Sequence, residues 1–289
     1  MNNLKRAIVF VHFDKDNIVD DYIYFYLAAL QEHASYLLFV TTSTLSQEDQ
    51  EKLSTFCSDI IIRENVGYDF MSYKTGLNAF DYTQYDELLI CNDSVYGPFY
   101  PLSEMFNTMQ TKACDFWGVT ENNDISYHLQ SYFLLFKKNL ITHENFKKFW
   151  EGVSVLENKE EIIEKYEVGL TRFFQESGFT PSSYIQFKPT ISHKLFIILK
   201  KLTPCKIIKK IYTLLSGRYP VTRVGKINAT LHFWKELILT TKMPFIKVMM
   251  LRDNPNNMKI DTFSEVLSQV SEYDAALIEK HLARTKEKK

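Results

Sequence analysis

The sequence of 289 residues has only four cysteines, and none of them lies close to another. They are Cys57, Cys91, Cys114 and Cys205, so the chain has no CxxC pair. This spacing does not predict a disulfide framework and favours a reduced, intracellular compartment.

Long hydrophobic runs are also missing. No stretch reaches the roughly 18 to 20 apolar residues that cross a bilayer. The first apolar run, AIVFVHF, is short and leads into Asp14 and Asp16 rather than into a cleavage site, so no signal peptide is predicted. A net charge of −1 excludes a general nucleic-acid-binding protein.

Acidic residues are absent from residues 177–235, where eleven lysines and arginines occur. Because the whole chain carries −1 and this segment carries +11, the rest of the chain carries −12. Such an asymmetry indicates a local anionic partner.

The chain does contain a regular alternation of apolar, strand-like runs with segments of helical spacing. The strand-like runs are 6–13, 35–42, 58–64, 86–93, 114–121 and 128–138, and the helical segments are 17–33, 46–56, 70–80, 101–112, 142–151, 157–165 and 167–177. This alternation predicts an α/β fold with Rossmann-like βαβ units and a parallel sheet. We expect one α/β domain over residues 1–188 and a mainly helical region over residues 189–289.

Polar clusters follow two of the predicted strands. They are RENVGYDFMSYKTGL (63–77) and CNDSVYGPF (91–99). Ligands of open α/β sheets bind beyond the carboxyl ends of the strands, so we expect both clusters to line one crevice. The helix predicted after the first cluster would offer its N-terminal amides to an anion.

Four residues of the first cluster are candidates for donor binding. Arg63 and Asn65 are suited to donate to phosphate or sugar oxygens. Gly67 allows the backbone to come close to a ligand, and Asp69 is suited to accept from a sugar hydroxyl. The alternative is a helix cap followed by a solvated turn.

Asp93, between Asn92 and Ser94, is a candidate ligand of a divalent cation. One carboxylate can take one site on Mg²⁺, whose other ligands are diphosphate oxygens and water. The alternative is an Asx-turn or a helix cap. His12 and Asp14 follow the first strand and are candidates for contacts with the base and ribose of a nucleotide.

Several long motifs resemble the rhamnan synthesis protein F family. They are the two clusters above, together with DFWGVTENNDISYHLQSYFLLF and FWKELILTTKMPFIKVMMLRDNP. The resemblance runs from the first strand to about Pro255. It implies a bacterial glycosyltransferase that builds rhamnose-containing cell-surface polysaccharides, with a type-A fold that binds a nucleotide-sugar, usually with Mg²⁺ or Mn²⁺.

The chain departs from the usual type-A metal motif. That motif is Asp-x-Asp, whereas this sequence has Asn92-Asp93-Ser94, with a single carboxylate. Metal dependence is therefore open. Arg63 or Lys74 is an alternative source of positive charge at the diphosphate.

An inverting transfer also needs a general base that takes the proton of the acceptor hydroxyl. The segment YEVGLTRFFQESGF (166–179) resembles the part of inverting type-A enzymes in which an acidic residue opens a helix. The resemblance makes Glu167 the first candidate base and leaves Glu121 as the second. The alternative for Glu167 is helix capping without catalysis.

Candidates for acceptor binding lie in the segments before and within HLQSYF. As a strand, HLQSYF would place His128, Gln130 and Tyr132 on one face, where His128 and Gln130 would bind an acceptor sugar. Trp117 is a candidate stacking platform. The alternatives are a structural histidine and a tryptophan packed in the core.

The basic segment 192–216 reads as two short amphipathic helices hinged near Pro204. Basic amphipathic helices bind anionic membrane surfaces. The alternative is a helix pair packed on the first domain with a solvated lysine face. The lysines concerned are Lys194, Lys200, Lys201, Lys206, Lys209 and Lys210. The later segment with Trp234, Pro244, Phe245 and Lys247 fits the family pattern, and we expect it to pack back on the first domain or to close the acceptor cleft.

Together these features predict a glycosyltransferase held at the cytoplasmic face of the inner membrane. Its expected partners are a nucleotide-sugar, a lipid-linked glycan in O-antigen, capsule or rhamnan synthesis and an anionic lipid surface, with no nucleic acid. The expected sugar is L-rhamnose from dTDP-L-rhamnose. Alternatives are a galactofuranosyl or hexosyl donor, a non-catalytic nucleotide-sugar-binding scaffold subunit, and a membrane adaptor with an α/β platform.

Overall fold

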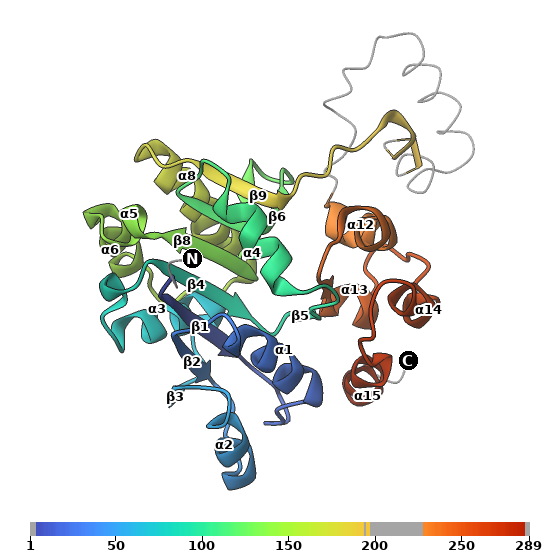
Figure 1. Cartoon of the computed structure of the whole chain (residues 1–289), viewed down its shortest axis with the longest axis horizontal. Coiled ribbons are helices and arrows are strands. Elements are labelled where there is room, and N and C mark those ends of the chain that lie inside the picture. Colours follow the sequence, from blue (N-terminus) through green and yellow to red (C-terminus); the bar gives the residue numbers. More distant parts are fainter. Residues whose placement is uncertain (1–3, 194, 197–227, 287–289) are drawn as a thin grey trace.

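The computed structural model describes residues 4–193, 195–196 and 228–286 (Figure 1). Its centre is a mixed, mostly parallel sheet. The strands of this sheet are β1 (Arg6–His12), β2 (Tyr36–Thr41), β3 (Asp59–Ile62), β4 (Glu87–Asn92), β6 (Phe116–Asn122), β7 (His128–Leu129), β8 (Phe133–Lys137) and β9 (Pro181–Ile185).

The strand order decides which loops meet. The order is β3-β2-β1-β4-β8-β6, and β7 and β9 both pair with β6. Strands β1 to β4 are parallel, whereas β8 is antiparallel to both β4 and β6. The carboxyl ends of β1 to β4 and of β6 therefore lie at one edge, and the reversed strand β8 begins at that same edge.

Both faces of the sheet are covered, as expected for parallel strands made of continuous apolar runs. In β1, Ala7, Val9 and Val11 pack in one apolar cluster, and Ile8 and Phe10 pack in the other. The helices of this part are α1 (Asp21–Gln31), α2 (Gln47–Leu53), α3 (Tyr68–Asn78), α4 (Leu102–Gln110), α5 (Lys138–Ile141), α6 (Glu144–Glu151), α7 (Lys159–Ile162) and α8 (Gly169–Glu176), with the 3₁₀ turn η1 (Tyr82–Gln84) and the π-helical segment η2 (Ile163–Val168).

The predicted α/β class is confirmed, because the sheet is mostly parallel and the strands alternate with helices. Two details differ from the prediction. Helix α1 begins at Asp21 instead of residue 17, because Asp14 Oδ1 accepts the amides of Asp16 and Ile18 and holds this stretch as a loop. The helices predicted at 157–165 and 167–177 are one continuous helix, since α7, η2 and α8 follow one another without a break.

The C-terminal part is mainly helical and packs back on the α/β domain. Its elements are α11 (Ala229–His232), α12 (Trp234–Thr241), β10 (Ile246–Lys247), α13 (Val248–Arg252), α14 (Phe263–Ser268) and α15 (Ala275–Thr285). Strand β10 pairs antiparallel with β5 (Val95–Tyr96), on the side of the sheet where the orange and red helices stand in Figure 1. The Phe245 ring lies 5.1 Å from Tyr26 and 5.8 Å from Phe133, so both parts share one apolar core.

The predicted membrane-binding lysines (Lys194, Lys200, Lys201, Lys206, Lys209 and Lys210) all lie outside the described residues. Membrane contact by this segment stays a prediction. Within residues 4–193, 195–196 and 228–286, no helix is long and apolar enough to cross a bilayer.

Candidate active site

Asp93 follows β4 directly, at the edge where the parallel strands end. The backbone amide of Phe13, which follows β1, donates to Asp93 Oδ2 at 2.8 Å. The Tyr22 hydroxyl donates to the Asp93 carbonyl oxygen at 3.1 Å. Burial, and after it the charge of Asp69, raises the pKa of Asp93 to about 8. The carboxyl group is thus held by the loop after β1, and the backbone of Asp93 is tied to α1.

Asp69 reaches the same place from the first turn of α3. The Asn92 side-chain amide donates to Asp69 Oδ2 at 2.8 Å, and Asn92 Oδ1 accepts from the Ser94 hydroxyl at 2.6 Å. Burial raises the pKa of Asp69 as well. The clusters 63–77 and 91–99 therefore meet, as predicted from the parallel sheet, and their roles in donor binding stay predictions.

Glu167 comes to this edge from the helix formed by α7, η2 and α8. It lies in η2, and π-helical turns inside α-helices are frequent at functional sites. The Ser131 amide donates to Glu167 Oε2 at 3.3 Å, and the Ser131 hydroxyl donates to the same oxygen. Because Glu167 lies well inside a continuous helix, helix capping does not explain it, and the predicted helix start at this residue is wrong.

His128 holds the other oxygen of the Glu167 carboxylate. Its Nε2 lies 3.5 Å from Glu167 Oε1, and its Nδ1 lies 2.8 Å from the carbonyl oxygen of Ser126. A carbonyl oxygen only accepts, so Nδ1 carries a hydrogen and Nε2 faces the carboxylate. Burial lowers the pKa of His128, but the bonds to Glu167 and to the Ser126 carbonyl and the charges of Glu167 and Asp124 together outweigh burial, and the pKa is raised. An imidazolium–carboxylate pair is the arrangement that results.

The pKa of Glu167 is shifted down, whereas the pKa of His128 is shifted up. Burial raises the pKa of Glu167, but the bond from His128, the charge of Lys247 and the bond from Ser131 together lower it below its usual value. Glu167 is therefore an ionised carboxylate at neutral pH.

Tyr73 shows that the three predicted carboxylates share one neighbourhood. Its buried hydroxyl donates to the Ser131 carbonyl oxygen at 3.1 Å. Burial raises the pKa of Tyr73, and the charges of Asp69, Asp93 and Glu167 raise it further. These carboxylates therefore stand around a single side chain rather than on separate faces of the molecule.

Lys247 reaches the site from the C-terminal part and was not predicted as a site residue. Strand β10 places Lys247 opposite Val95, and the Val248 amide donates to the Ser94 carbonyl oxygen at 2.8 Å. The Lys247 ammonium lies 5.3 Å from the centre of the Tyr132 ring. Burial lowers its pKa, and the nearby charge of Glu167 opposes this. In the sequence, Lys247 stood out only as part of the motif FWKELILTTKMPFIKVMMLRDNP.

Arg63 and Lys74 are engaged in holding loops. Arg63 donates to the Ser72 hydroxyl at 2.8 Å and to the carbonyl oxygens of residues 64, 66 and 68. Lys74 donates to the carbonyl oxygens of Glu151 and Val153 at 2.9 and 2.7 Å. Their contacts do not support the idea that either one replaces a metal at a diphosphate.

Gly67 is explained by the turn before α3. Its φ of 72° is in the left-handed region, and a Cβ atom there would lie 2.3 Å from Met71 Cγ. A ligand is not needed to account for this glycine. Asn65 and Ser94 are exposed at the ends of their loops and remain candidates for donor contact.

The predicted acceptor platform is wrong for Trp117. Its side chain is 1% exposed and packs 6.0 Å from the Phe106 ring and 5.8 Å from the Phe133 ring, so the core-packing alternative holds. Gln130 is 2% exposed, and its Oε1 accepts from the Thr120 hydroxyl at 2.7 Å. His128 is 2% exposed and its Nε2 faces Glu167, so all three side chains are buried and in contact with protein groups.

Glu121, the second candidate base, lies at the end of β6. Its Oε2 accepts from the Ser183 hydroxyl at 2.8 Å and from the Tyr127 hydroxyl at 3.4 Å. These contacts tie Glu121 to β9 and to its own loop. Glu167 is the better placed of the two candidates, because it adjoins Asp69 and carries oriented donors.

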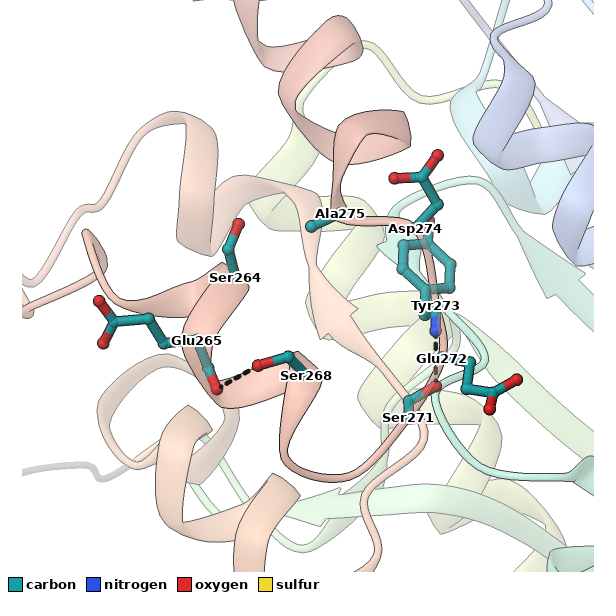
Figure 2. Close-up of a pocket in the computed structure, with 8 residues that line it drawn as sticks. All are labelled: Ser264, Glu265, Ser268, Ser271, Glu272, Tyr273, Asp274 and Ala275. Carbon is teal, nitrogen blue, oxygen red and sulfur yellow. Dashed lines mark hydrogen bonds between the residues drawn. The ribbon is translucent and has the colours of Figure 1, made fainter.

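A shallow depression lies outside this site, between α14 and α15 (Figure 2). It is open to solvent, and the Ser268 hydroxyl and the Tyr273 amide at its rim bond within the same segment, to Glu265 O and Ser271 Oγ. No residue predicted for the site lines it. It therefore adds nothing to the donor or acceptor side.

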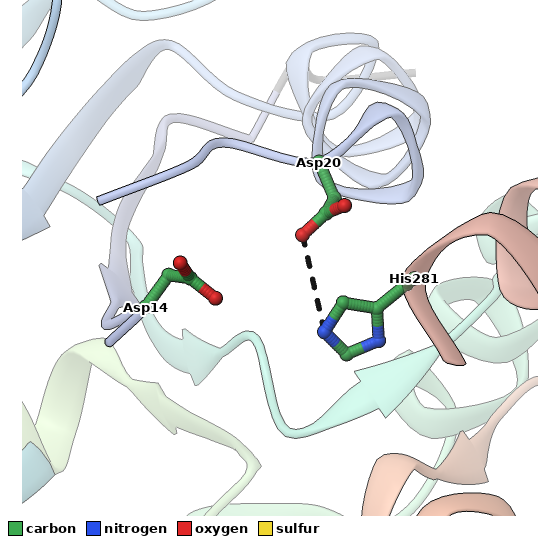
Figure 3. A group of neighbouring side chains, drawn as sticks. All are labelled: Asp14, Asp20 and His281. Atoms are coloured by element: carbon green, nitrogen blue, oxygen red, sulfur yellow. Dashed lines mark ion pairs between the residues drawn. The ribbon is translucent and has the colours of Figure 1, made fainter. Parts of the chain in front are cut away.

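The loop after β1 carries a second acidic group. Asp14, Asp20 and His281 bring potential metal-ligand atoms within 4.8 Å of one another (Figure 3). Arg284 on α15 donates to Asp14 at 2.7 Å and to Asp20 at 2.5 Å, so an arginine already supplies positive charge there. His12 is buried on Thr41, and burial lowers its pKa to about 4, which leaves it neutral.

Comparison with known proteins identifies relatives over most of the chain. The family model described as rhamnan synthesis protein F matches residues 37–229. Virulence protein VirA of Vibrio anguillarum (strain ATCC 68554 / 775) is 29% identical over 270 residues, which cover 88% of this chain and 81% of VirA. The uncharacterized protein y4gN of Sinorhizobium fredii (strain NBRC 101917 / NGR234) is 31% identical over 153 residues, which cover 51% of this chain and 40% of y4gN.

Among solved structures, the chain aligns with the glycosyltransferase GlyE in Streptococcus pneumoniae TIGR4. The alignment covers 98% of this chain and 65% of that chain, at 12% identity and a TM-score of 0.45. Glucosyl-3-phosphoglycerate synthase from Mycobacterium tuberculosis, solved with Mn²⁺, UDP and phosphoglyceric acid, aligns over 64% of this chain and 82% of that chain. Its identity is 6% and its TM-score is 0.37.

Proposed function

The chain belongs to the rhamnan synthesis protein F family, and on this premise we propose that it is an inverting glycosyltransferase of cell-surface polysaccharide synthesis. Family membership supports a glycosyltransferase that uses a nucleotide-sugar. The finer proposal is transfer of L-rhamnose from dTDP-L-rhamnose to a lipid-linked glycan, as in O-antigen, capsule or rhamnan synthesis. A galactofuranosyl or hexosyl donor is the alternative within the same enzyme class.

The observation that carries the proposal is the setting of Glu167. Its carboxylate is held by Ser131 and His128 in a π-helical turn, and it adjoins Asp69 and, through Tyr73, Asp93. In the proposed step, Glu167 takes the proton of an acceptor hydroxyl while that oxygen bonds to the anomeric carbon. The bond from that carbon to the diphosphate breaks, and the electron pair leaves with the nucleoside diphosphate.

Asp69 and Asp93 fit a divalent cation on the donor side. Both offer carboxylate oxygens, which Mg²⁺ and Mn²⁺ prefer. Burial raises the pKa of both, and the charge of Asp69 raises the pKa of Asp93 further, which a cation would relieve. A bound cation would supply positive charge to the departing diphosphate. Asp69 thus offers a second carboxylate that the motif Asn92-Asp93-Ser94 lacks, and Asn92 holds Asp69 through its amide.

The site is expected to work close to a membrane if the acceptor is lipid-linked. The basic segment 192–216 would then bind an anionic lipid surface, and the protein would be peripheral on the cytoplasmic face of the inner membrane. Support for this part of the proposal comes from the sequence, through the eleven cations and the absence of acids in residues 177–235.

Screening purified protein against a panel of nucleotide-sugars tests the proposal. The panel holds dTDP-L-rhamnose, UDP-galactofuranose and UDP-hexoses, and release of nucleoside diphosphate is measured with and without a glycoside acceptor. We expect one donor to be consumed faster when the acceptor is present. Binding of a nucleotide-sugar with no turnover of any donor would instead indicate the non-catalytic scaffold.

A further inference from the structure

Two polar groups beside Glu167 lack hydrogen-bond partners among the described residues. One is Asp124 Oδ1, an inward-facing atom in the loop between β6 and β7. The other is the ammonium of Lys247, a partly buried residue; it lies 5.3 Å from the Tyr132 ring centre and makes no hydrogen bond to a described residue. A buried acceptor without a partner, such as Asp124 Oδ1, is costly, and such atoms commonly bind a ligand or a water.

The two groups lie close to each other and to the candidate base. The charge of Asp124 acts on both His128 and Lys247, and the charge of Lys247 acts on Glu167. Asp124 and Lys247 do not form an ion pair with each other within the described part of the chain. The other oxygen of Asp124 accepts from the Asn122 amide at 3.0 Å, which fixes the carboxylate.

An acceptor and a donor without protein partners near a candidate base match the chemistry of a sugar. Each sugar hydroxyl can donate one hydrogen bond and accept others. A ring with neighbouring hydroxyl groups can therefore donate to Asp124 Oδ1 and accept from Lys247, while a third hydroxyl faces Glu167. An anion would satisfy Lys247 and be repelled by Asp124 and Glu167.

We propose that Asp124 and Lys247 form the acceptor subsite, and that this subsite binds an uncharged, polyhydroxylated pyranose. The inference rests on the proposed function and assigns the acceptor side of the same site. It replaces Trp117, His128 and Gln130, whose side chains are buried and bonded inside the protein. Because Asp124 Oδ1 faces inward, sugar binding requires the loop at residues 123–127 to shift, and the tip residue Ile125 is half exposed.

This assignment also gives the C-terminal part a function in the site. Lys247 stands on β10, which pairs with β5 immediately after the segment that contains Asp93. The sequence led to two expectations for this region, packing on the first domain or closing the acceptor cleft. In this proposal the same segment does both. Packing of Phe245 in the core places Lys247 at the acceptor side.

The test measures binding of simple glycosides by saturation-transfer NMR. Methyl α-L-rhamnopyranoside and methyl α-D-glucopyranoside are the probes, and wild type is compared with Asp124→Asn, Lys247→Met and Lys247→Arg. Matched controls are Asp261→Asn and Lys235→Met, because both residues are exposed. Thermal unfolding of every variant checks that the fold is intact.

We expect Asp124→Asn and Lys247→Met each to weaken binding roughly tenfold or more, because each variant loses a hydrogen bond that involves a charged group. Lys247→Arg should recover part of the loss, and the controls should bind like wild type. Nucleotide binding should change less than about twofold in all variants.

Two outcomes would overturn the inference: wild type binds neither glycoside, or both substituted variants bind as well as wild type. The proposed function fails separately, when no nucleotide-sugar in the panel is turned over. Glycoside binding that depends on Asp124 and Lys247 in a protein without turnover would keep the subsite and reject the enzyme.

Discussion

Asp93 and Glu167 are two carboxylates of one site in opposite electrostatic surroundings. Asp93 is partly buried near another acid, Asp69, and its pKa is raised to about 8. Glu167 is surrounded by His128, Ser131 and Lys247, and its pKa is lowered. Environments that push the pKa values of two acids apart indicate different roles. The surroundings of Asp93 are suited to a cation that binds a diphosphate. The surroundings of Glu167 keep its carboxylate ionised, as a general base requires.

The largest effect is expected from removing the charge of Glu167, which tests the contrast between Glu167 and Asp93. Glu167→Gln keeps a side-chain oxygen for Ser131 and removes the proton acceptor. We expect the transfer rate to fall by roughly 10²- to 10⁴-fold, the usual contribution of a general base, while donor binding stays unchanged. Steady-state rates with donor and acceptor measure this.

Glu164→Gln is the matched control for Glu167→Gln. Glu164 lies in the same π-helical segment and is exposed, so its substitution should leave the rate within about twofold. Full activity in Glu167→Gln would remove Glu167 as the base and return attention to Glu121.

A smaller effect is expected from His128→Asn, which keeps a donor for the Ser126 carbonyl and removes the positive charge. The raised pKa of His128 means that its charge is present below that pKa and lost as the pH rises through it. The lowered pKa of Glu167 means that its charge is present above that pKa and lost as the pH falls through it. The ion pair is complete between the two values.

Without the imidazolium, the pKa of Glu167 should rise toward its usual value. We therefore expect the acid limb of the pH–rate profile to move to higher pH, with the loss in rate confined to acidic buffer near and below the usual pKa of a glutamate. An acid limb that stays where wild type has it would show that His128 only fills space beside Glu167.

The sheet and the meeting of the two polar clusters could be predicted from sequence because their signals are local. Continuous apolar runs mark β1 and β4, and polar residues directly after a strand end must lie at the sheet edge. The meeting of Asp69 with Asp93 follows from parallel pairing alone. The start of α1 was wrong by four residues because side-chain bonds from Asp14 hold the preceding loop.

The surroundings of Glu167 could not be predicted because their contacts join distant segments. Ser131 reaches Glu167 only because β8 is reversed and begins at the edge where the parallel strands end. Lys247 is brought near Glu167 by the two-residue pairing of β10 with β5, and no hydrophobic periodicity in the sequence predicts so short a strand. Trp117 is a different case. From sequence, an aromatic residue beside a glycine fits a stacking platform for a sugar and a core position equally well, and only its burial in the structure distinguishes the two.

The donor side can be tested through stability. Asp93 keeps its proton up to about pH 8, whereas in the unfolded chain it ionises near 3.8. Between these values the folded state holds a proton that the unfolded state has lost, so this group makes stability fall as the pH rises. Asp93→Asn cannot ionise and should escape that loss.

We expect Asp93→Asn to melt several degrees above wild type in alkaline buffer and close to it in acid, since each kcal/mol moves Tm by roughly 2–4 °C in large domains. Differential scanning calorimetry across the pH range measures the difference. Glu167→Gln should show no such gain, because the folded state favours the charged form of Glu167. A constant difference at all pH values would mean that Asp93 is ionised throughout.

The smallest expected effect is stabilisation by Mn²⁺, which shows whether a cation binds at Asp69 and Asp93 or at Asp14 and Asp20. Asp69 and Asp93 lie where a cation would relieve their repulsion, whereas Asp14 and Asp20 already have Arg284. Mn²⁺ at about ten times its Kd should stabilise wild type by about 1.4 kcal/mol, or a few degrees in Tm. Asp69→Asn and Asp93→Asn should each remove this increment, and Asp20→Asn should keep it even if its starting Tm is lower. The reverse result, with the increment lost only in Asp20→Asn, would move the metal to the group beside His281 and leave Asp93 as a proton-holding carboxyl.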